Sequence, residues 1–403
     1  MKNRFGIVAT LGFTQTLAWA STYYLPAILA VPIARDIGVA PTWIYAGLSL
    51  GLGVSAFLGP SLGRLIDRRG GRRVLCGSNV GFAVGLIMLG ESVGPASLVL
   101  AWLVLGVAMA AGLYEPAFAA LTRLYGHDSR GAITGITLIA GFSSTVGWPI
   151  STLMEHTFGW RGTCVAWAAL HLTCGLPLNA WALSDRIEDA SVVQPVPGVE
   201  IAEQKKDADR AMRRLAFMFT TGGIVSIGMS TNLPRLFNAI GASPAAAIAA
   251  ASLMGPAQVV ARIIEYSARR RVNPLLSAKI ASVLHPVAAI VLAVGGAPAA
   301  ALFSVIHGAG NGMLTIVRGT LPLALFGPSG YGARIGRISA PARVGQAFAP
   351  FLIGLSIDRL GADTLIISAG LYLAAFISLF GLSLPRPGAV GQPIDRVNGS
   401  TGE

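Results

Sequence analysis

The chain has 403 residues, of which 53% are hydrophobic and 12% are charged, and its formal net charge is +12. A typical soluble domain carries about 25% charged residues, so this chain has about half the usual charge. The composition excludes a disordered protein, and a soluble fold of this length has too little interior for so much apolar surface. Several apolar runs reach about 20 residues, the length of a helix that crosses a bilayer. We therefore expect an all-α membrane protein.

Apolar segments long enough to span a bilayer alternate with clusters of charged and turn residues along the chain. We predict twelve transmembrane helices, with approximate bounds 5–31, 42–62, 74–92, 96–121, 132–154, 162–183, 214–236, 245–265, 274–294, 298–326, 335–357 and 364–384. An even number of spans puts both termini on the same side of the membrane.

The basic residues indicate which side that is. If the N-terminus is cytoplasmic, the inside segments hold 22 Lys and Arg residues and the outside loops hold 3. Such an excess on the cytoplasmic side is typical of membrane proteins. It predicts a multi-pass protein of the cell (inner) membrane with both termini cytoplasmic, surrounded by lipid and without a nucleic-acid partner. Five basic residues remain in or near spans, namely Arg235, Arg262, Lys279, Arg318 and Arg343.

A polar segment divides the spans into two groups of six. Residues 185–213 contain two prolines and mixed charges, as expected of a linker. We predict an N-terminal six-helix bundle over 1–184, a cytoplasmic linker over 185–213, a C-terminal bundle over 214–385 and a cytoplasmic tail over 386–403.

The two groups contain a repeated block. Residues 64–75 (RLIDRRGGRRVL) and 262–273 (RIIEYSARRRVN) are identical at five of twelve positions, and Asp67 aligns with Glu265. A Gly-Pro pair precedes each block, and both blocks lie between the second and third spans of their group. This repeat indicates two related bundles.

The first block resembles a known signature. Gly63-x-x-x-Asp67-Arg68-Arg69-Gly70-Gly71-Arg72-Arg73 is similar to the loop between helices 2 and 3 in the major facilitator superfamily. The resemblance covers about residues 5–385. It implies two pseudo-symmetric six-helix bundles around a central cavity, transport by alternating access and a monomeric protein.

An acidic residue at a helix end beside arginines can hold helix ends together on one face of the membrane. We interpret the block as such a conformational lock, with positive-inside anchoring as the alternative. Arg262 is either part of the second copy of the lock or a substrate ligand. The candidate lock residues are Gly63, Asp67, Arg68, Arg72, Arg73, Arg262 and Glu265.

The resemblance implies that the first, fourth, seventh and tenth helices line the cavity. Polar side chains on one face of a membrane helix must contact protein or water, because lipid cannot satisfy them. They bind substrate, or they make polar contacts between helices. The candidate substrate-binding residues are Gln15, Trp19, Tyr23, Tyr114, Asn311, Thr315 and Arg318.

Glu115 lies inside the predicted fourth span, followed by Pro116. Ionised groups are costly inside a membrane and are usually functional there. We predict that Glu115 carries a proton, with a fixed salt bridge as the alternative. Arg318 lies at a similar depth on the symmetry-related tenth helix, so the two residues could pair across an empty cavity.

The predicted function is secondary transport of a small organic solute. Gly147-Trp148-Pro149 followed by Gly159-Trp160-Arg161 is similar to the monocarboxylate and oxalate/formate-type branches. Together with Arg318, this similarity favours an organic anion, a carboxylate, moved with proton coupling or anion exchange. The alternative is proton-driven efflux of lipophilic, drug-like compounds.

Other classes of function lack sequence support. The chain has no His-Glu-x-x-His and no Walker-type phosphate loop. His171, His285 and His307 lie in spans without a metal-binding spacing. We expect no enzymatic activity, no cofactor and no metal.

Overall fold

The computed structural model describes residues 3–183, 202–268 and 272–384. These residues are almost entirely helical, and no strand occurs among them. The predicted all-α membrane fold is confirmed. Seven stretches of the described chain are long and apolar enough to cross a membrane, and the longest joins consecutive helices from Pro95 to Ala182. The count of twelve spans stays a prediction.

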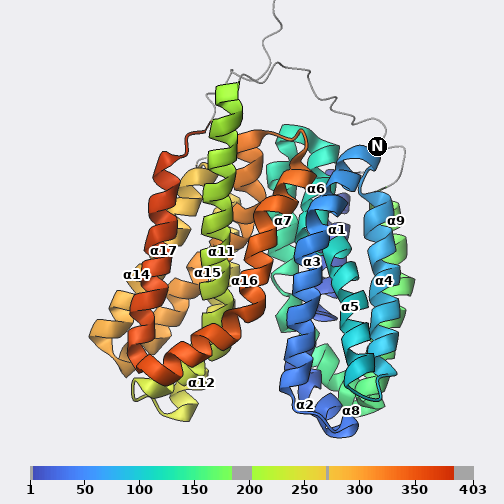
Figure 1. The fold of residues 1–403 in the computed structure, drawn as a ribbon, viewed down its shortest axis with the longest axis horizontal. Coiled ribbons are helices and arrows are strands. Elements are labelled where there is room, and N and C mark those ends of the chain that lie inside the picture. Colours follow the sequence, from blue (N-terminus) through green and yellow to red (C-terminus); the bar gives the residue numbers. More distant parts are fainter. Residues whose placement is uncertain (1–2, 184–201, 269–271, 385–403) are drawn as a thin grey trace, which may run out of the picture.

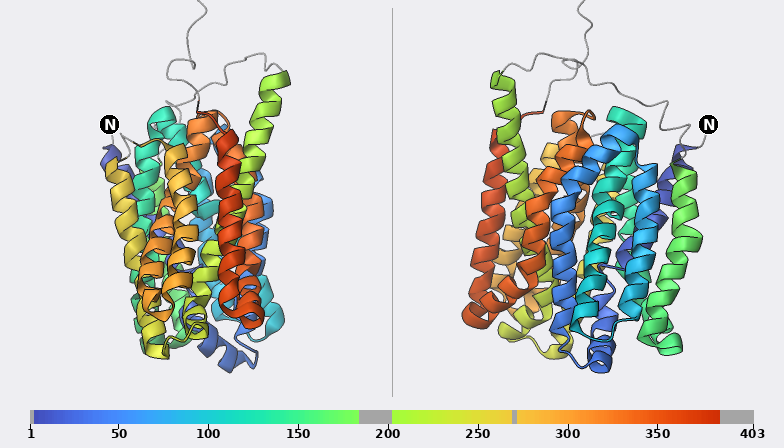
Figure 2. Two further views of the ribbon diagram at one scale, coloured as in Figure 1. Left: turned by 90° about the vertical axis from the view of Figure 1, so that its left-hand side faces the viewer. Right: turned by 45° about the vertical axis from the view of Figure 1, so that its right-hand side comes forward.

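The helices of the first half stand together, blue to green in Figure 1, beside those of the second half, yellow-green to red. The first half comprises α1 (Arg4–Ala20), α2 (Pro26–Ile37), α3 (Thr42–Arg69), α4 (Arg72–Gly90), α5 (Pro95–Gly112), α6 (Tyr114–Tyr125), α7 (Ser129–Ala140), α8 (Ser143–Leu170), a π-helical turn (His171–Gly175) and α9 (Leu176–Ala182). The second half comprises α11 (Ala202–Ala239), α12 (Pro244–Ser252), α13 (Met254–Ala268), α14 (Pro274–Gly295), α15 (Ala300–Phe326), α16 (Tyr331–Leu360) and α17 (Thr364–Ser378). Figure 2 shows the long helices of both halves running roughly parallel.

The predicted linker is partly helical. Helix α11 begins at Ala202, inside the predicted linker 185–213, and its first turns rise above the rest of the molecule in Figure 1. The remainder of the predicted linker, 185–201, lies outside the described residues, as does the predicted tail over 386–403.

One apolar cluster joins the two halves. Phe118 of α6 and Ile133 of α7 pack with Tyr331 and Ile335 of α16, and all four side chains are 2% exposed or less. Burial of this much apolar area stabilises the contact between the halves. The cluster lies towards the end of the molecule that carries the predicted cytoplasmic loops.

The first predicted span, 5–31, is interrupted between α1 and α2. The Oγ atom of Ser21 donates to the Leu17 carbonyl at 2.8 Å, and Oγ1 of Thr22 donates to the Ala18 carbonyl at 2.6 Å. The Leu17 carbonyl also accepts from the Ser21 N–H at 3.1 Å, so these hydroxyls add side-chain bonds to the last turn of α1. Pro26, which has no N–H to donate, then begins α2.

The fourth predicted span, 96–121, breaks at Leu113, whose backbone is extended. Pro116 cannot donate a helical hydrogen bond to the Gly112 carbonyl. The Nε2 atom of Gln15 donates to that carbonyl instead, at 2.7 Å. The break restarts the helix at Tyr114, so Glu115 lies in the first turn of α6.

Candidate functional site

A cavity of about 110 Å³ lies between the two halves. Six of the seven residues predicted to bind substrate line it, namely Trp19, Tyr23, Tyr114, Asn311, Thr315 and Arg318. Gln15 is the exception, because its side chain is 1% exposed and bonds the Gly112 carbonyl. The structure thus gives Gln15 the helix–helix contact that was the alternative for it.

The charge of the cavity is strongly positive. Three guanidinium groups line it, those of Arg262, Arg318 and Arg343. Among the described lining residues Glu115 is the one carboxylate, so the ionised wall carries a net charge of +2. Charges in a site with few water molecules act on a ligand more strongly than charges in water. The lining residues therefore give the cavity a positive electrostatic potential.

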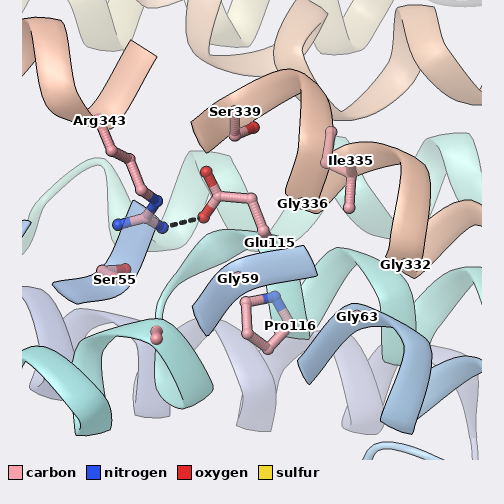
Figure 3. Close-up of a pocket in the computed structure, with 11 residues that line it drawn as sticks. Ser55, Gly59, Gly63, Glu115, Pro116, Gly332, Ile335, Gly336, Ser339 and Arg343 are labelled. Atoms are coloured by element: carbon pink, nitrogen blue, oxygen red, sulfur yellow. Dashed lines mark hydrogen bonds and ion pairs between the residues drawn. The ribbon is translucent and has the colours of Figure 1, made fainter. Parts of the chain in front are cut away.

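Glu115 of α6 forms an ion pair with Arg343 of α16 (Figure 3). The Arg343 and Glu115 side chains are only 9% and 21% exposed. The sequence left open whether Glu115 pairs with Arg318, on the tenth predicted span, and the structure pairs it with an arginine of the eleventh. Because α6 belongs to the first half and α16 to the second, this ion pair also connects the two halves.

Arg318 of α15 contacts a neutral partner. With the amide of Gln346 oriented so that its oxygen meets donors, Oε1 accepts from Nη1 and Nη2 of Arg318 at 3.1 Å each. The buried Nε atom of Arg318 has no hydrogen-bond partner within the described structure. A guanidinium binds a carboxylate more strongly than it binds a neutral amide. Arg318 thus has unused capacity for an anionic ligand.

Arg262 of α13 is held in a similar way. Its Nη2 atom lies 3.4 Å from Oε1 of Gln258 and 3.4 Å from Oγ1 of Thr315, which are long hydrogen bonds to neutral groups. Its Nε atom is buried without a partner among the described residues. The Arg262 side chain lies in the cavity wall at the point where Asn311 and Thr315 of α15 also line it.

Asp67 connects the end of α3 to the start of α16. Its Oδ1 accepts from the Gly332 N–H and its Oδ2 from the Ala333 N–H, both at 2.8 Å. The first N–H groups of a helix have no partner within the helix, and the positive end of the helix dipole favours a carboxylate there. Arg123 of α6 donates to the main-chain oxygen of Asp67 at 2.5 Å.

Glycines bring α3 and α16 into backbone contact beside this bond. Figure 3 shows Gly59 and Gly63 of α3 facing Gly332 and Gly336 of α16. A Cβ atom added at Gly336 would lie 2.7 Å from the Gly59 carbonyl oxygen, and one at Gly63 would overlap the Gly332 carbonyl. Two small residues four positions apart on each helix allow such an approach. A Cβ atom at Gly63, Gly332 or Gly336 would push the helices apart, whereas one at Gly59 would meet nothing closer than 3.9 Å.

The family model described as Major Facilitator Superfamily matches residues 11–303. The chain belongs to the major facilitator superfamily. Comparison with curated proteins gives no significant match. Membership of this superfamily shows that the protein is a multi-pass transporter of small solutes rather than an enzyme.

Solved structures of this superfamily have the same fold. The human organic anion transporter MFSD10 (TETRAN) matches with a TM-score of 0.69 at 16% identity, covering 94% of this chain and 100% of that one. The proton:xylose symporter XylE also has a TM-score of 0.69, at 14% identity, with coverages of 94% and 95%. FucP in its outward conformation has a TM-score of 0.66 at 12% identity, with coverages of 93% and 98%. At these identities the likeness concerns the fold alone.

The second copy of the superfamily motif forms a different contact from the first. Glu265 is 4% exposed, and its Oε1 accepts from the Ser277 hydroxyl at 2.6 Å. Arg130 of α7 lies 4.0 Å from the same oxygen and donates to the Val272 carbonyl at 2.7 Å. Glu265 therefore contacts the first half through an arginine, whereas Asp67 contacts the second half through backbone N–H groups.

The predicted lock arginines occupy the loop side of the motif. Arg68, at the end of α3, and Arg73, at the start of α4, are exposed, and Arg72 is half-buried. The partners that the structure gives to the Asp67 carboxylate lie on α16, rather than on the neighbouring loop. Arg262, although aligned with Arg64 in the repeat, extends into the cavity wall.

Sequence reasoning missed several residues of this transporter's cavity wall, among them Arg343 and Gln346. The sequence predicts Arg343 only as a basic residue within a span and assigns no role to Gln346. Both lie on α16, three residues apart and so on one helix face, and both line the cavity. The available signal was the presence of an arginine and an amide on one face of a membrane helix. The resemblance implied that other helices line the cavity, so this helix was not expected to contribute.

Proposed function

We propose that this transporter carries a small organic anion, a carboxylate, by alternating access with proton coupling or anion exchange. The observation that carries the proposal is the net charge of +2 on the ionised cavity wall. Arg318 and Arg262 hold only neutral groups, so an entering carboxylate gives each a stronger acceptor than it has now. A charged residue inside the membrane costs free energy. The presence of three arginines at this depth therefore favours a functional role for them.

The proposal includes a role for Glu115 as proton carrier. As a carboxylate it neutralises Arg343, and after taking up a proton it no longer does so. A proton would therefore free a further guanidinium for an anionic substrate. It would also release one connection between α6 and α16.

We further propose a conformational lock between the two halves and an orientation of the protein in the membrane. Asp67, with Gly63 and the loop arginines Arg68, Arg72 and Arg73, would hold the cytoplasmic ends of the halves together, and Glu265 would do so through Arg130. Both termini would lie in the cytoplasm, at the inner membrane, and the protein would act as a monomer.

Arg318→Ala should weaken carboxylate binding by about 10- to 100-fold, since a hydrogen bond to a charged group contributes about 1.5–3 kcal/mol. Thermal unfolding of the detergent-purified protein would be followed with small carboxylates, sugars, amino acids and lipophilic cations. A bound ligand raises stability according to its affinity and concentration. Arg235→Ala is the matched control, because Arg235 pairs with Asp358 and both side chains are more than half exposed.

Stabilisation by a carboxylate that persists in Arg235→Ala and disappears in Arg318→Ala would support the proposal. Stabilisation by lipophilic cations alone, equal in both variants, would contradict it. That second result would favour drug efflux, the alternative from the sequence, which would use the aromatic part of the cavity and leave the arginines without an anionic partner.

Glu115→Gln should make transport independent of pH, because glutamine keeps the shape of the side chain and cannot ionise. Uptake of the stabilising carboxylate into proteoliposomes would be measured at pH 6 and pH 8. Glu91→Gln, an exposed position at the end of α4, serves as the control. A Glu115→Gln variant that retains the pH dependence of the unmodified protein would exclude Glu115 as the proton carrier.

A further inference from the structure

We infer that the substrate is a small aromatic carboxylate, with its ring against the first half and its carboxylate against the second. The inference rests on the proposed function, because it assumes that the cavity binds an anion. It adds the chemical class of the rest of the substrate and the direction in which the substrate lies. Aromatic and cationic side chains are distributed unevenly between the two halves in the cavity wall.

The first half supplies an aromatic wall. Five aromatic residues of this half line the cavity, and Phe219 of α11 is the one aromatic lining residue from the described part of the second half. The aromatic wall consists of Trp19, Tyr23, Tyr24, Tyr114 and Phe118. The Trp19 ring centroid lies 5.3 Å from that of Tyr23 and 4.9 Å from that of Tyr114, and Tyr114 stacks on Phe118 at 5.4 Å.

The two helix breaks create this wall. Trp19 lies in the last turn of α1, and Tyr23 and Tyr24 lie in the interruption before α2. Tyr114 begins α6 directly after the break at Leu113. Each break thus turns aromatic side chains towards the cavity at membrane depth. The buried Nε1 atom of Trp19 has no hydrogen-bond partner among the described residues, so the wall also offers an unused donor.

The second half supplies the cationic wall. All three guanidinium groups come from α13, α15 and α16, and Arg343 is neutralised by Glu115. The remaining two, Arg262 and Arg318, each have a buried Nε atom without a partner in the described structure. Trp19, Tyr23 and Tyr114 of the aromatic wall line the same cavity of about 110 Å³ as these arginines. The two walls therefore border one small space.

A ligand that satisfies both walls needs a flat apolar body and one anionic end. Aromatic rings gain additional attraction from edge-to-face and offset-stacked contacts, and the rings of this wall already adopt both arrangements with one another. A saturated ring of the same size fills the space without these contacts. The volume of about 110 Å³ lies below the range of about 300–1,000 Å³ that holds drug-sized ligands, which favours one small ring.

Such a ligand would connect the two halves directly. Its ring would contact α1 and α6, and its carboxylate would contact Arg318 on α15 and Arg262 on α13. Closing the cavity around it would improve both sets of contacts together. A ligand with only one of the two parts would contact one half and would favour closure less.

The test compares three probes of similar size on the unmodified, detergent-purified protein. Sodium benzoate has the ring and the charge, cyclohexanecarboxylate has the charge with a saturated ring, and benzyl alcohol has the ring without the charge. We expect benzoate to bind about 3- to 10-fold more tightly than cyclohexanecarboxylate, the range that aromatic pairing contributes beyond area. Benzyl alcohol should bind more weakly than both.

Variants separate the two contributions. Trp19→Leu should reduce the preference for benzoate over cyclohexanecarboxylate to about 1, whereas Trp43→Leu should leave it unchanged. Trp43 is 44% exposed at the start of α3 and does not line the cavity. Arg318→Ala should weaken both carboxylates equally and leave benzyl alcohol unaffected.

Equal affinities for benzoate and cyclohexanecarboxylate, both lost in Arg318→Ala, would overturn the aromatic inference and leave the anion proposal standing. Binding of benzyl alcohol as tight as that of benzoate would contradict the anion proposal itself. Absence of benzoate binding at about 10 mM would also overturn the inference, since even a weak specific site is occupied at that concentration.

Discussion

Arg343→Ala should lower the free energy of unfolding by about 3 kcal/mol, because it leaves a mostly buried carboxylate without its partner. Glu115 is 21% exposed and Arg343 is 9% exposed, so little water is present to replace the lost ion pair. Removing one member of a buried pair usually costs about 3–5 kcal/mol, and the partial exposure of Glu115 puts this pair at the lower end. The quantity to measure is the denaturant midpoint of the detergent-purified protein.

The matched control is a second arginine–acid pair within the same chain. Arg235 pairs with Asp358, and their side chains are 52% and 57% exposed. An exposed pair contributes about 0–1 kcal/mol, so Arg235→Ala should have a small effect. Equal shifts in the two variants would contradict the importance given to the buried pair. Glu115→Gln combined with Arg343→Gln should recover part of the loss, since no buried charge is then left unpaired.

Gly63→Val should separate α3 from α16 and reduce transport strongly. The new Cβ atom would overlap the carbonyl of Gly332 and lie 2.9 Å from the Ala333 nitrogen, and backbone atoms cannot turn aside. Overpacking typically costs about 1–3 kcal/mol, which shifts a two-state equilibrium by about 5- to 150-fold. Hydrogen exchange of the Gly332 and Ala333 amides reports the change directly, because the Asp67 carboxylate holds both. We expect these amides to exchange faster by a factor in that range.

Gly53→Val is the control for this experiment. Gly53 lies on the same helix, and an added Cβ atom there would meet nothing within 4 Å. Any general effect of valine on α3 should therefore be present in both variants, and the effect on α16 in only one. Unchanged exchange at Gly332 and Ala333 in Gly63→Val would show that the close contact is not needed to hold the helix start.

Helix α16 is connected to the first half at several successive points. Asp67 holds its first N–H groups, the glycines bring its next turns against α3, and Arg343 pairs with Glu115. The glycine contact and the ion pair line one small pocket, which Figure 3 shows. Under our proposal, protonation of Glu115 removes one of these connections while substrate occupies Arg318. A proton and a substrate would then act on the same helix.

A local structural role explains the Gly159-Trp160-Arg161 sequence, which suggested a carboxylate-transporting branch. Gly159 has φ 68°, a left-handed conformation that few other residues adopt without strain. Arg161 pairs with Asp36 at 2.9 Å and donates to the Gly90 carbonyl, and Trp160 also donates to Asp36. These bonds join α2, α4 and α8 at one end of the first half. The pattern therefore describes how this end is closed, and the support for an anion comes from the cavity.

The sequence by itself determined the class of the protein and much of its layout. Low charge and long apolar runs required membrane helices, and the loop motif around Asp67 with its second copy indicated the superfamily. Which residues share a face of a single helix could also be predicted, because helical periodicity places Asn311, Thr315 and Arg318 on one face. These features depend on local sequence and on composition, which a single chain displays directly.

The tertiary structure alone decided which groups meet. Glu115 pairs with Arg343, 228 residues away, whereas the sequence left open a pairing with Arg318, at a similar depth. Gln15 turned out to satisfy a carbonyl left open by Pro116, and Asp67 turned out to bind the start of α16. Such contacts depend on how helices are rotated and broken, and a break of one or two residues changes the direction of every side chain that follows. Helical periodicity assumes an unbroken helix, so it cannot predict them.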